Sequence, residues 1–507
     1  MTEGLMKNTS LTAMALAAGM VLSIGSGFAA DLGGNCCADL EERIAELEAT
    51  TARKGTRKTS LEVWGSINKM IVAWDDGINK NTALGIDNVN YSTRFGFRGN
   101  AKIRSDITAG YSIVVEQATG GRSTNLSQFA DKAPGSGIST TATNFKSEFS
   151  TNDTAITMRE GNWWLESNHL GRVTVGRFVG GAGPQGTIDL AGIGLTAASG
   201  SFSLIGTGFN FRTNQPVVNP STPGSANSGA APSSSFTNYN IGNVTDGAGE
   251  YSTRQNGVMW ASPVLAGFTL TASLAGSIEK DGIATNAAGT ATAGYGPLWS
   301  VGLKYANEFN GVRVAAAYGH EDAVDSNYTS LISTNGTSIR PHSTNDGVSL
   351  SLMHVATGLF GQGFYNEYTR GHDLFTAAGA PSAYSLAGNT KDTAKQWLIQ
   401  GGVVRNWFGY GNTALYAEYG RTDNGFNAIG LERAGSAFYS ATLGGVAYTG
   451  DVTKQRVWGL GVVQNIDAAA MELYSGYRNF SLSSDNCALA GGCKDIGMFV
   501  SGARIKF

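Results

Sequence analysis

The chain has 507 residues, of which 70 are glycine, and charged residues make up 15%. Glycine is therefore about twice its usual share, and charge is well below the usual share of about a quarter. The glycines have no three-residue period, which excludes collagen, and helical repeats do not tolerate so much glycine. The aromatic content of 10% excludes a disordered chain. With 36 basic and 39 acidic residues, no nucleic-acid partner is expected, and an all-β protein remains.

Residues 1–30 are predicted to be a cleaved secretory signal peptide. Lys7 precedes the apolar run 11–24, which ends in small residues, as in such signals. The run is short for a membrane-spanning helix of about 20 residues, so an uncleaved anchor is the weaker interpretation. Translation could start at Met1 or Met6, and the cleavage position stays open.

Residues 31–58 are predicted to be a short periplasmic coiled-coil helix followed by a basic linker. Leu40, Ile44 and Leu47 alternate at spacings of four and three residues, as in the seam of a coiled coil. A helix of about two heptads is too short to be stable alone. We therefore expect it to form only where several copies are held together. The basic stretch 53–58 is expected to be a solvated linker.

The four cysteines lie in two pairs near the ends of the chain. An exported chain reaches an oxidising compartment, which favours a disulfide between Cys487 and Cys493. Cys36 and Cys37 are adjacent, so pairing between chains is the more interesting option for them. No histidine lies at ligand spacing near either pair, and no metal or cofactor is expected.

From residue 60 onward apolar and polar residues alternate, for example over 268–275, 299–306, 312–319 and 471–478. Such alternation indicates strands with one apolar and one polar face. Short turns are expected at 104–106, 168–171, 263–267, 308–311, 356–358, 408–411 and 465–467. Long loops are expected at 75–90, 119–156, 179–250, 279–296, 323–343, 372–392, 424–451 and 483–493. Seven turns and eight loops connect 16 strands.

Short turns that alternate with long loops are typical of an outer-membrane β-barrel, here spanning 59–507. A propeller would need four strands in each repeat and has no reason to separate short from long connections. The chain ends in an alternating strand whose last residue, Phe507, shares a face with Phe499, Ala503 and Ile505. A terminal phenylalanine of this kind resembles the signal read by the barrel assembly machinery.

Three strand segments resemble Gram-negative trimeric porins. They are Val-Trp-Gly at 63–65, Ser-Thr-Arg-Phe-Gly-Phe-Arg-Gly at 92–99 and Leu-Gly-Arg-Val-Thr-Val-Gly-Arg at 170–177. The segment 33–55, which contains the two adjacent cysteines and the heptads, is similar to the alphaproteobacterial, rhizobial-type porins. This resemblance implies a 16-stranded barrel, a homotrimer and a long third loop folded into the channel. It also implies contact with outer-membrane lipid and lipopolysaccharide.

The second of these segments places two arginines in the lumen. Arg94 and Arg98 alternate with Phe95 and Phe97, so they share the face opposite the two aromatic rings. The resemblance implies that Arg94 belongs to the basic wall of a pore constriction, and Arg98 is assigned to the same wall. The inward face is expected to be polar and wide enough for water, because 16 strands enclose an aqueous lumen.

The resemblance adds Arg159 and Arg254 to this basic wall. It places Asp189, on the third loop, on the acidic side, and Glu116 is expected to face the lumen as well. Arg177 is assigned a contact with a neighbouring subunit.

Glu160 and Lys69 fall on the outward face by simple alternation. A charge that faces lipid is costly, so both are interpreted as subunit-interface or bulge positions. The alternative is that the assumed register is wrong by one residue.

The sequence therefore favours a channel for passive diffusion of ions and small hydrophilic solutes. A substrate-specific channel is the closest alternative, and a structural or adhesin barrel is another. An enzyme is not expected, because His320 and His342 are isolated and no nucleophile–base set is recognisable.

Overall fold

The computed structural model describes most of the chain from residue 59 onward. The described residues are 59–117, 121–123, 126, 128, 156–183, 186, 188–197, 205–213, 236–241, 254–276, 284–285, 291–292, 298–324, 337–376, 393–423, 441–443, 446–448, 453–484, 487–488 and 491–507. The predicted signal peptide, Cys36, Cys37 and the predicted coiled coil with Leu40, Ile44 and Leu47 therefore lie outside the described residues.

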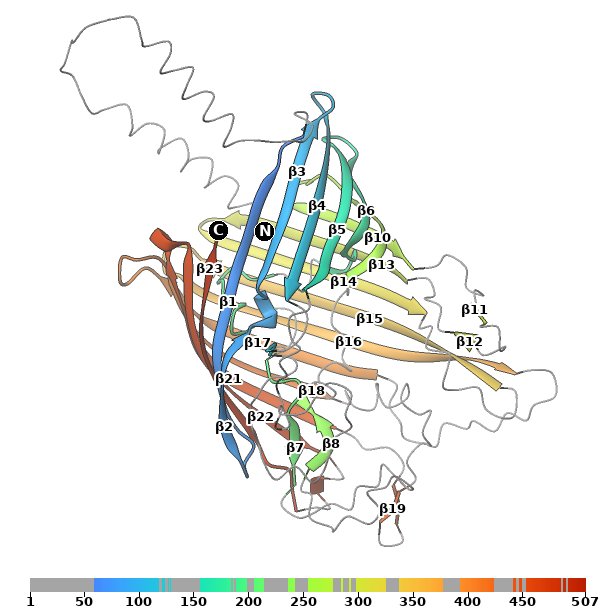
Figure 1. Cartoon of the computed structure of the whole chain (residues 1–507), viewed down its shortest axis with the longest axis vertical. Helices are drawn as coiled ribbons and strands as arrows, with labels where there is room; N and C mark the ends of the chain where they lie inside the picture. Colours follow the sequence, from blue (N-terminus) through green and yellow to red (C-terminus); the bar gives the residue numbers. More distant parts are fainter. Residues whose placement is uncertain are drawn as a thin grey trace, which may run out of the picture.

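The long strands form one antiparallel sheet (Figure 1). They are β1 (Glu62–Asp75), β2 (Lys80–Asp87), β3 (Arg94–Lys102), β4 (Ile107–Gln117), β5 (Ile156–Ser167), β6 (Gly171–Val179), β9 (Arg254–Ala261), β10 (Phe268–Ala275), β13 (Leu298–Phe309), β14 (Val312–Val324), β15 (Thr337–His354), β16 (Leu359–Thr376), β17 (Thr393–Arg405), β18 (Thr413–Asp423), β21 (Lys454–Ile466), β22 (Met471–Ser483) and β23 (Ile496–Lys506).

Short elements lie in the connections between these strands. They are the strand pairs β7 (Asn210–Arg212) with β8 (Phe236–Asn240), β11 (Ala284–Thr285) with β12 (Ala291–Thr292) and β19 (Ala441–Leu443) with β20 (Val446–Tyr448), and the 3-10 helices η1 (Val89–Tyr91) and η5 (Asp467–Ala469). No helix among the described residues is both long and apolar enough to cross a bilayer.

Strand β1 closes the sheet into a barrel. It pairs with β23 on one side, while β3 and β2 pair with its first and second halves on the other side. The sheet has 17 strands, but β2 and β3 occupy one position in the ring. The described strands thus form a closed barrel with 16 positions, and the prediction of 16 antiparallel strands is confirmed.

The predicted short turns are confirmed, whereas two long loops are shorter than predicted and one is absent. β15 begins at Thr337, within 323–343, and β16 ends at Thr376, within 372–392. Most residues of the other predicted long loops lie outside the described part of the chain. All seven short turns lie where expected, between β3 and β4 and then between each later pair of strands joined at that end. The long loop predicted for 75–90 is wrong, because β2 occupies half of it and a tight turn at 76–79 joins β1 to β2. Gly85 in β2 has a positive φ of 73°, which breaks the alternation that would have revealed the strand.

The second strand of the barrel is interrupted between β2 and β3, where η1 leaves the wall. Asn88 caps this short helix by accepting a hydrogen bond from the backbone of Asn90. Asn68 on β1 donates a 2.7 Å hydrogen bond to the carbonyl of Tyr91 and accepts one of 2.6 Å from the hydroxyl of Tyr474. These contacts fix Tyr91 on the inner side of the wall.

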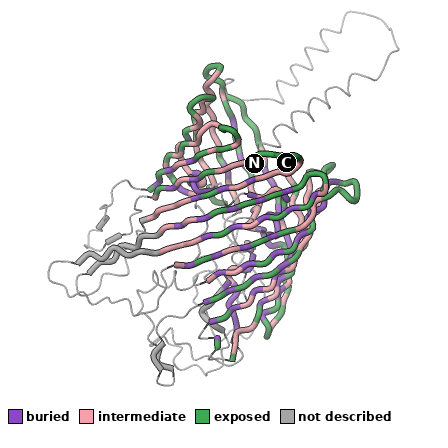
Figure 2. Tube along the Cα trace, turned by 180° about the vertical axis from the view of Figure 1, so that it is seen from behind, coloured by how far each residue is buried: buried purple, intermediate pink, exposed green. Residues whose placement is uncertain are grey.

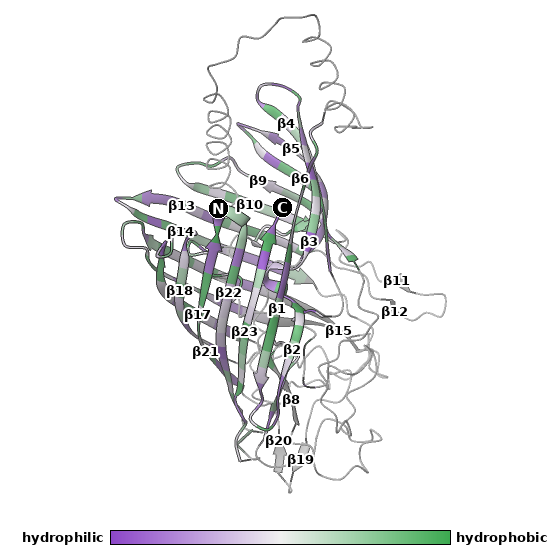
Figure 3. Ribbon diagram, turned by 60° about the vertical axis from the view of Figure 1, so that its left-hand side comes forward, coloured by the Kyte–Doolittle hydropathy of each residue, from purple (hydrophilic) through white to green (hydrophobic). Residues whose placement is uncertain are grey.

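The outward face of the barrel is apolar. Large side chains such as Leu303, Ile399 and Leu460 are exposed there, and Figure 3 shows apolar and polar residues alternating along the strands. Aromatic residues lie on the outward face toward the long-loop ends of β13 to β21. Trp299, Tyr318, Tyr365, Tyr419 and Trp458 are exposed there, and Trp397 is half-buried. An apolar band with an aromatic row is typical of a barrel that faces lipid.

The inward face is only partly polar, which corrects the expectation of a polar inner wall. Figure 2 shows buried and exposed positions alternating along the strands. A buried apolar cluster joins inward residues of β1 and of β15 to β23 to residues 191–197 and 205–211. These residues belong to the segment between β6 and β9, which is called the third connection below. Its largest members include Phe209, Phe211 and Phe480, all 0% exposed. Part of the lumen is therefore filled by packed side chains.

The outward face supplies a stability test. Leu350 on β15 lies between the exposed apolar residues Val348 and Leu352, so Leu350→Arg should reduce the free energy of unfolding in lipid vesicles by roughly 2–4 kcal/mol. Guanidinium unfolding measures this loss. Val355→Arg, in the short turn after β15, is the control, and an equal loss in both variants would contradict the proposed lipid-facing position of Leu350.

Candidate functional site

Arg94 and Glu116 lie opposite each other on the inner side of β3 and β4. Phe95 and Phe97 are 40% and 37% exposed on the outward face, whereas Gly96 between them is buried. The alternation along β3 thus places Arg94 on the inner side of the barrel, away from the apolar outer face. Gly96 packs closely beneath the indole of Trp64, which leaves little room there for a side chain.

A β-bulge at Arg159 turns two consecutive charged residues toward the lumen. Val114 on β4 lies opposite Glu160, and the next residue along β4 lies opposite Met158, so Arg159 has no partner in the ladder. Met158 is half exposed on the outside, while Val114 is buried. The outward position that simple alternation gave Glu160 is therefore wrong, and the bulge interpretation is correct.

Glu116 holds the arginines together rather than facing them from across the lumen. Its carboxylate forms an ion pair with Arg159, accepts a 2.6 Å hydrogen bond from Ser92 Oγ and lies 3.8 Å from Arg122 Nη2. The Glu116 side chain is 12% exposed. Glu116 thus neutralises part of the basic cluster from within the same wall.

Arg254 begins β9 and reaches the same region. Its Nε lies 3.7 Å from Oε1 of Glu160. Arg94 lies within electrostatic reach of Arg159, Arg254 and Arg504. The fold therefore brings together arginines from β3, β5, β9 and β23, which are far apart in the sequence.

Arg504 is a member of this group that the sequence reasoning did not identify. It forms an ion pair with Glu472 on β22, and its guanidinium lies 4.3 Å from the centre of the Tyr91 ring. The sequence does contain a pattern that could have identified it, because Arg504 lies on the face of β23 opposite to the outward residues Phe499 and Ile505. No sequence pattern predicts the position of Tyr91, because that position depends on the break between β2 and β3.

Arg98 lies apart from the other predicted arginines. Its Nε and Nη2 donate to the two carboxylate oxygens of Glu62 at 2.9 and 2.6 Å. Both side chains are about half exposed, near the end of the barrel that carries the short turns. Arg177 lies four residues after the outward Val173 on β6 and opposite Gly161. It therefore shares the face of Val173, which is the outer face.

Asp189 is buried in the third connection and caps its own loop. Its carboxylate accepts hydrogen bonds from the backbone of Gly192 at 2.8 Å and of Gly194 at 2.9 Å. Burial raises the pKa of Asp189 above its usual range. Gly194 packs against the ring of Tyr91, so Tyr91 separates this carboxylate from Arg504 and Arg94.

The described parts of the third connection lie against the inner wall along several strands. The contacts are Gly181 N to Ser273 Oγ at 2.8 Å, Ala182 N to Ser300 Oγ at 3.3 Å, Leu190 N to Ser351 Oγ at 3.4 Å and Asn88 Nδ2 to the carbonyl of Leu195 at 2.7 Å. The connection therefore touches β10, β13, β15 and the break between β2 and β3.

A buried row of polar side chains continues from one of these contacts. It runs through Ser351, Gln362, Gln400, Glu418 and Arg478 on β15, β16, β17, β18 and β22, with neighbours 3.2, 2.8 and 3.0 Å apart and then a bidentate ion pair. The last pair spans β21 at Gly459, where an added Cβ would lie 2.7 Å from Glu418 Oε1. The row gives this wall a fixed polar surface beneath the connection.

The described residues contain a disulfide between Cys487 and Cys493. Among the same residues, no group of three or more His, Cys, Asp or Glu side chains could hold a metal ion.

Comparison with known proteins gives similarity at the level of shape. No family model and no curated protein matches the chain. Among solved structures, the chain is similar to outer-membrane expressed OmpT of Vibrio cholerae, at 10% identity over 89% of this chain and 99% of the other, with a TM-score of 0.45. OmpF of Salmonella typhi in complex with daunomycin has 14% identity over 89% and 98%, with a TM-score of 0.44. The outer-membrane channel DcaP of Acinetobacter baumannii has 12% identity over 90% and 99%, also with a TM-score of 0.44.

Proposed function

We propose that this chain is an outer-membrane porin that forms a water-filled channel for passive diffusion of ions and small hydrophilic solutes. The observation that carries the proposal is the closed barrel with an apolar exterior and arginines of several strands gathered on its inner wall. A barrel of about 16 strands leaves room for an aqueous channel. Charged side chains inside such a wall select among ions.

The basic wall of the proposed constriction consists of Arg94, Arg159, Arg254 and Arg504. Arg98 belongs to the channel entrance in this proposal, because it is held by Glu62 near the short-turn end.

The third connection is proposed to form the opposite side. Since the Asp189 carboxylate is bound by its own loop, backbone groups and Tyr91, rather than a free acid, face the arginines.

The outer surface supports placement in an outer membrane. Beyond the aromatic row, charged side chains lie opposite one another on successive strands, namely His320, Asp346, Glu367, Lys395, Asp423 and Lys454. We propose that this charged row meets the head groups of lipid and lipopolysaccharide. Phe507, 65% exposed at the other end, is the proposed contact for the assembly machinery.

The homotrimer is proposed from charged groups on the outer face of β1 to β6. Lys69 lies between the exposed Ile67 and Ile71 on the outer face of β1. Its Nζ binds Asp87 at 3.2 Å and Gln117 at 2.7 Å. An outward lysine costs less against a protein partner than against lipid. Because β1 starts at the short-turn end, the segment 31–58 is proposed to be periplasmic, with the 1–30 signal removed.

Single-channel recording of the purified full-length protein in planar bilayers tests the function. Ohmic conductance in three equal steps is expected for a trimeric porin. Absence of conductance would overturn the pore and favour a structural or adhesin barrel. Block by a single solute class would favour a substrate-specific channel.

The arginine wall predicts the ion preference. The double variant Arg94→Ala with Arg159→Ala should raise conductance and shift permeability toward cations. At an effective dielectric constant of about 20, one charge about 10 Å from the ion path is worth about 0.6 kcal/mol after screening. Removal of two charges should therefore change the permeability ratio several-fold. The reversal potential in a salt gradient measures this ratio.

Arg104→Ala is the matched control, because it removes one arginine from an exposed turn. Arg98→Ala should change the ratio less than the double variant. An unchanged reversal potential in the double variant would remove both arginines from the constriction.

The coiled-coil segment predicts the stability of the assembly. Deletion of 36–51 should lower the temperature at which the trimer band dissociates in detergent, because three helices would no longer bury their apolar seam. Heated gel electrophoresis measures the transition, with deletion of the basic stretch 53–58 as the control. If the trimer bands of both deletion variants dissociate at the same temperature, the segment 36–51 acts only as a linker.

A further inference from the structure

The third connection is fastened at the long-loop end of the barrel by a buried ion pair. Arg212 on β7 lies 3.3 Å from Asp76 in the turn between β1 and β2, and the two side chains are 8% and 0% exposed. Asp76 is itself fixed, because it accepts hydrogen bonds from the backbone of Ile78 and Asn79 at 3.0 and 2.7 Å. Arg212 thus meets a carboxylate that cannot follow it if the connection moves.

A buried glutamine from the second long connection joins this pair. Gln128 Nε2 lies 3.3 Å from Asp76 and donates a 2.7 Å hydrogen bond to the carbonyl of Asn210. Its Oε1 accepts a 2.9 Å hydrogen bond from the backbone of Asn210. Both ends of the amide are therefore used to hold the backbone of β7.

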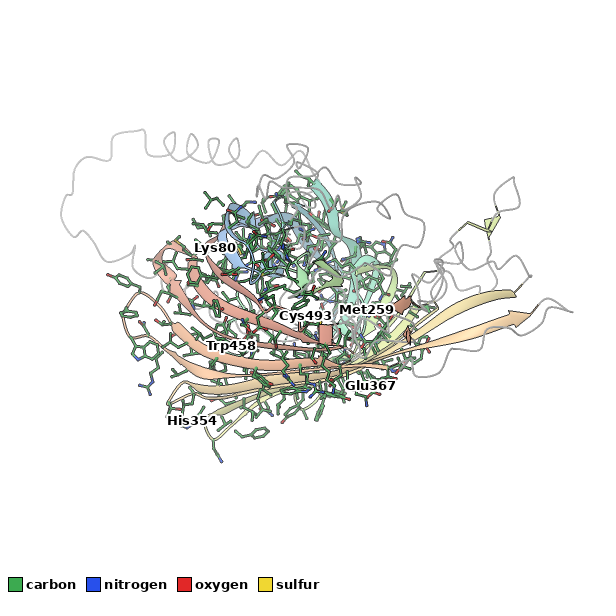
Figure 4. The ribbon with its side chains drawn as sticks, turned by 90° about the horizontal axis from the view of Figure 1, so that it is seen from below. Lys80, Met259, His354, Glu367, Trp458 and Cys493 are labelled. Carbon is green, nitrogen blue, oxygen red and sulfur yellow. A yellow bond between two sulfur atoms is a disulfide. The ribbon has the colours of Figure 1, made fainter. Side chains whose placement is uncertain are left out.

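The disulfide loop between β22 and β23 holds the other side of β7. Thr213 pairs with Cys493 in an antiparallel bridge, and the backbone of Lys494 donates a 2.7 Å hydrogen bond to the carbonyl of Arg212. Figure 4 shows Cys493 on the inner side of the C-terminal strands. The Cys487–Cys493 bond closes this loop, so it limits how far the bridge to Thr213 can move.

Apolar packing completes the attachment. Phe209 and Phe211 are 0% exposed and share one buried cluster with Trp74, Cys487 and Met498. The rings of Trp74 and Phe209 lie 5.1 Å apart in an edge-on arrangement. Residues 205–213 are thus bound by groups from the first turn, the second connection and the last connection.

We propose that Asp76, Gln128, Arg212 and the Cys487–Cys493 disulfide form a clamp that positions the third connection and so sets the width of the channel. The proposal rests on the proposed porin function. Residues 188–197 lie against Tyr91 and Ser351, and the clamp holds residues 205–213 at the long-loop end. With both attachments the connection lies across the lumen, and release of the clamp frees one end of it.

Single-channel recording on the full-length protein tests the clamp with two variants. Asp76→Asn keeps the Oδ1 that caps the turn but removes the buried charge beside Arg212. The double variant Cys487→Ser with Cys493→Ser opens the last connection. Each should raise open-channel conductance by about twofold and increase current noise, because a narrower passage gives way to a wider and fluctuating one.

Two controls separate this effect from general damage to the barrel. Asp106→Asn removes the carboxylate of an exposed turn ion pair with Arg104 by the same chemical change, and it should leave conductance unchanged. Reduction and alkylation of the folded wild-type protein should reproduce the double serine variant without any need to refold. The trimer band on heated gels shows in each sample that the barrel is intact.

The outcomes distinguish the clamp from the pore. Wild-type conductance and noise in both variants and in the reduced protein, with intact barrels, would overturn the clamp and leave the porin function standing. Silent wild-type protein would overturn the porin function and, with it, the role of the clamp.

Discussion

The structure depends on closure of one sheet between β1 and β23. In hydrocarbon every backbone N–H and C=O must find a partner inside the protein, and a closed ring of strands achieves this without an edge. The hydrogen bonds between β1 and the C-terminal strand continue to Phe507. This residue and Gly65 exchange backbone hydrogen bonds of 3.1 and 2.9 Å. Closure then assigns every strand residue to the outer face or to the lumen. The low charge of the chain follows because the residues of the outer face are mostly apolar.

The inner surface divides into two kinds of wall. Around β23, β3, β5 and β9 it carries the arginines, whereas from β15 to β23 it is covered by the third connection through apolar packing and the polar row that ends at Glu418 and Arg478. An ion pair this deeply buried is stabilising only when its remaining groups are hydrogen-bonded. Gln400 supplies such a bond to Glu418, whereas Nη1 of Arg478 is buried without a hydrogen-bond partner. One half of the barrel thus supports the connection, and in the proposed channel the other half remains for solutes.

The sequence predicts what is local and repetitive. The seven short turns and the number of strands follow from alternation and turn residues, which act over a few positions. The only sign of the bulge at Arg159 in the sequence is that two charged residues, Arg159 and Glu160, are adjacent. A regular strand would turn one of them toward the apolar outer face. The inward apolar residues Phe209 and Phe480 could not be assigned, because their partners come from distant segments. The ion pair between Asp76 and Arg212 could not be predicted either. The two residues are 136 positions apart, and a periodic pattern gives no information on contacts at that distance along the chain.

The carboxylates nearest the arginines lie on the same wall as the arginines. Glu116, Glu160 and Glu472 each hold a neighbouring arginine, so much of the field runs along the wall rather than across the lumen. Such a field weakens within about a Debye length, which is about 8–10 Å in physiological salt. In the proposed channel a solute therefore senses the arginines only if the third connection keeps the passage narrow. The position of that connection then governs ion preference as well as width, which joins the two walls into one functional unit.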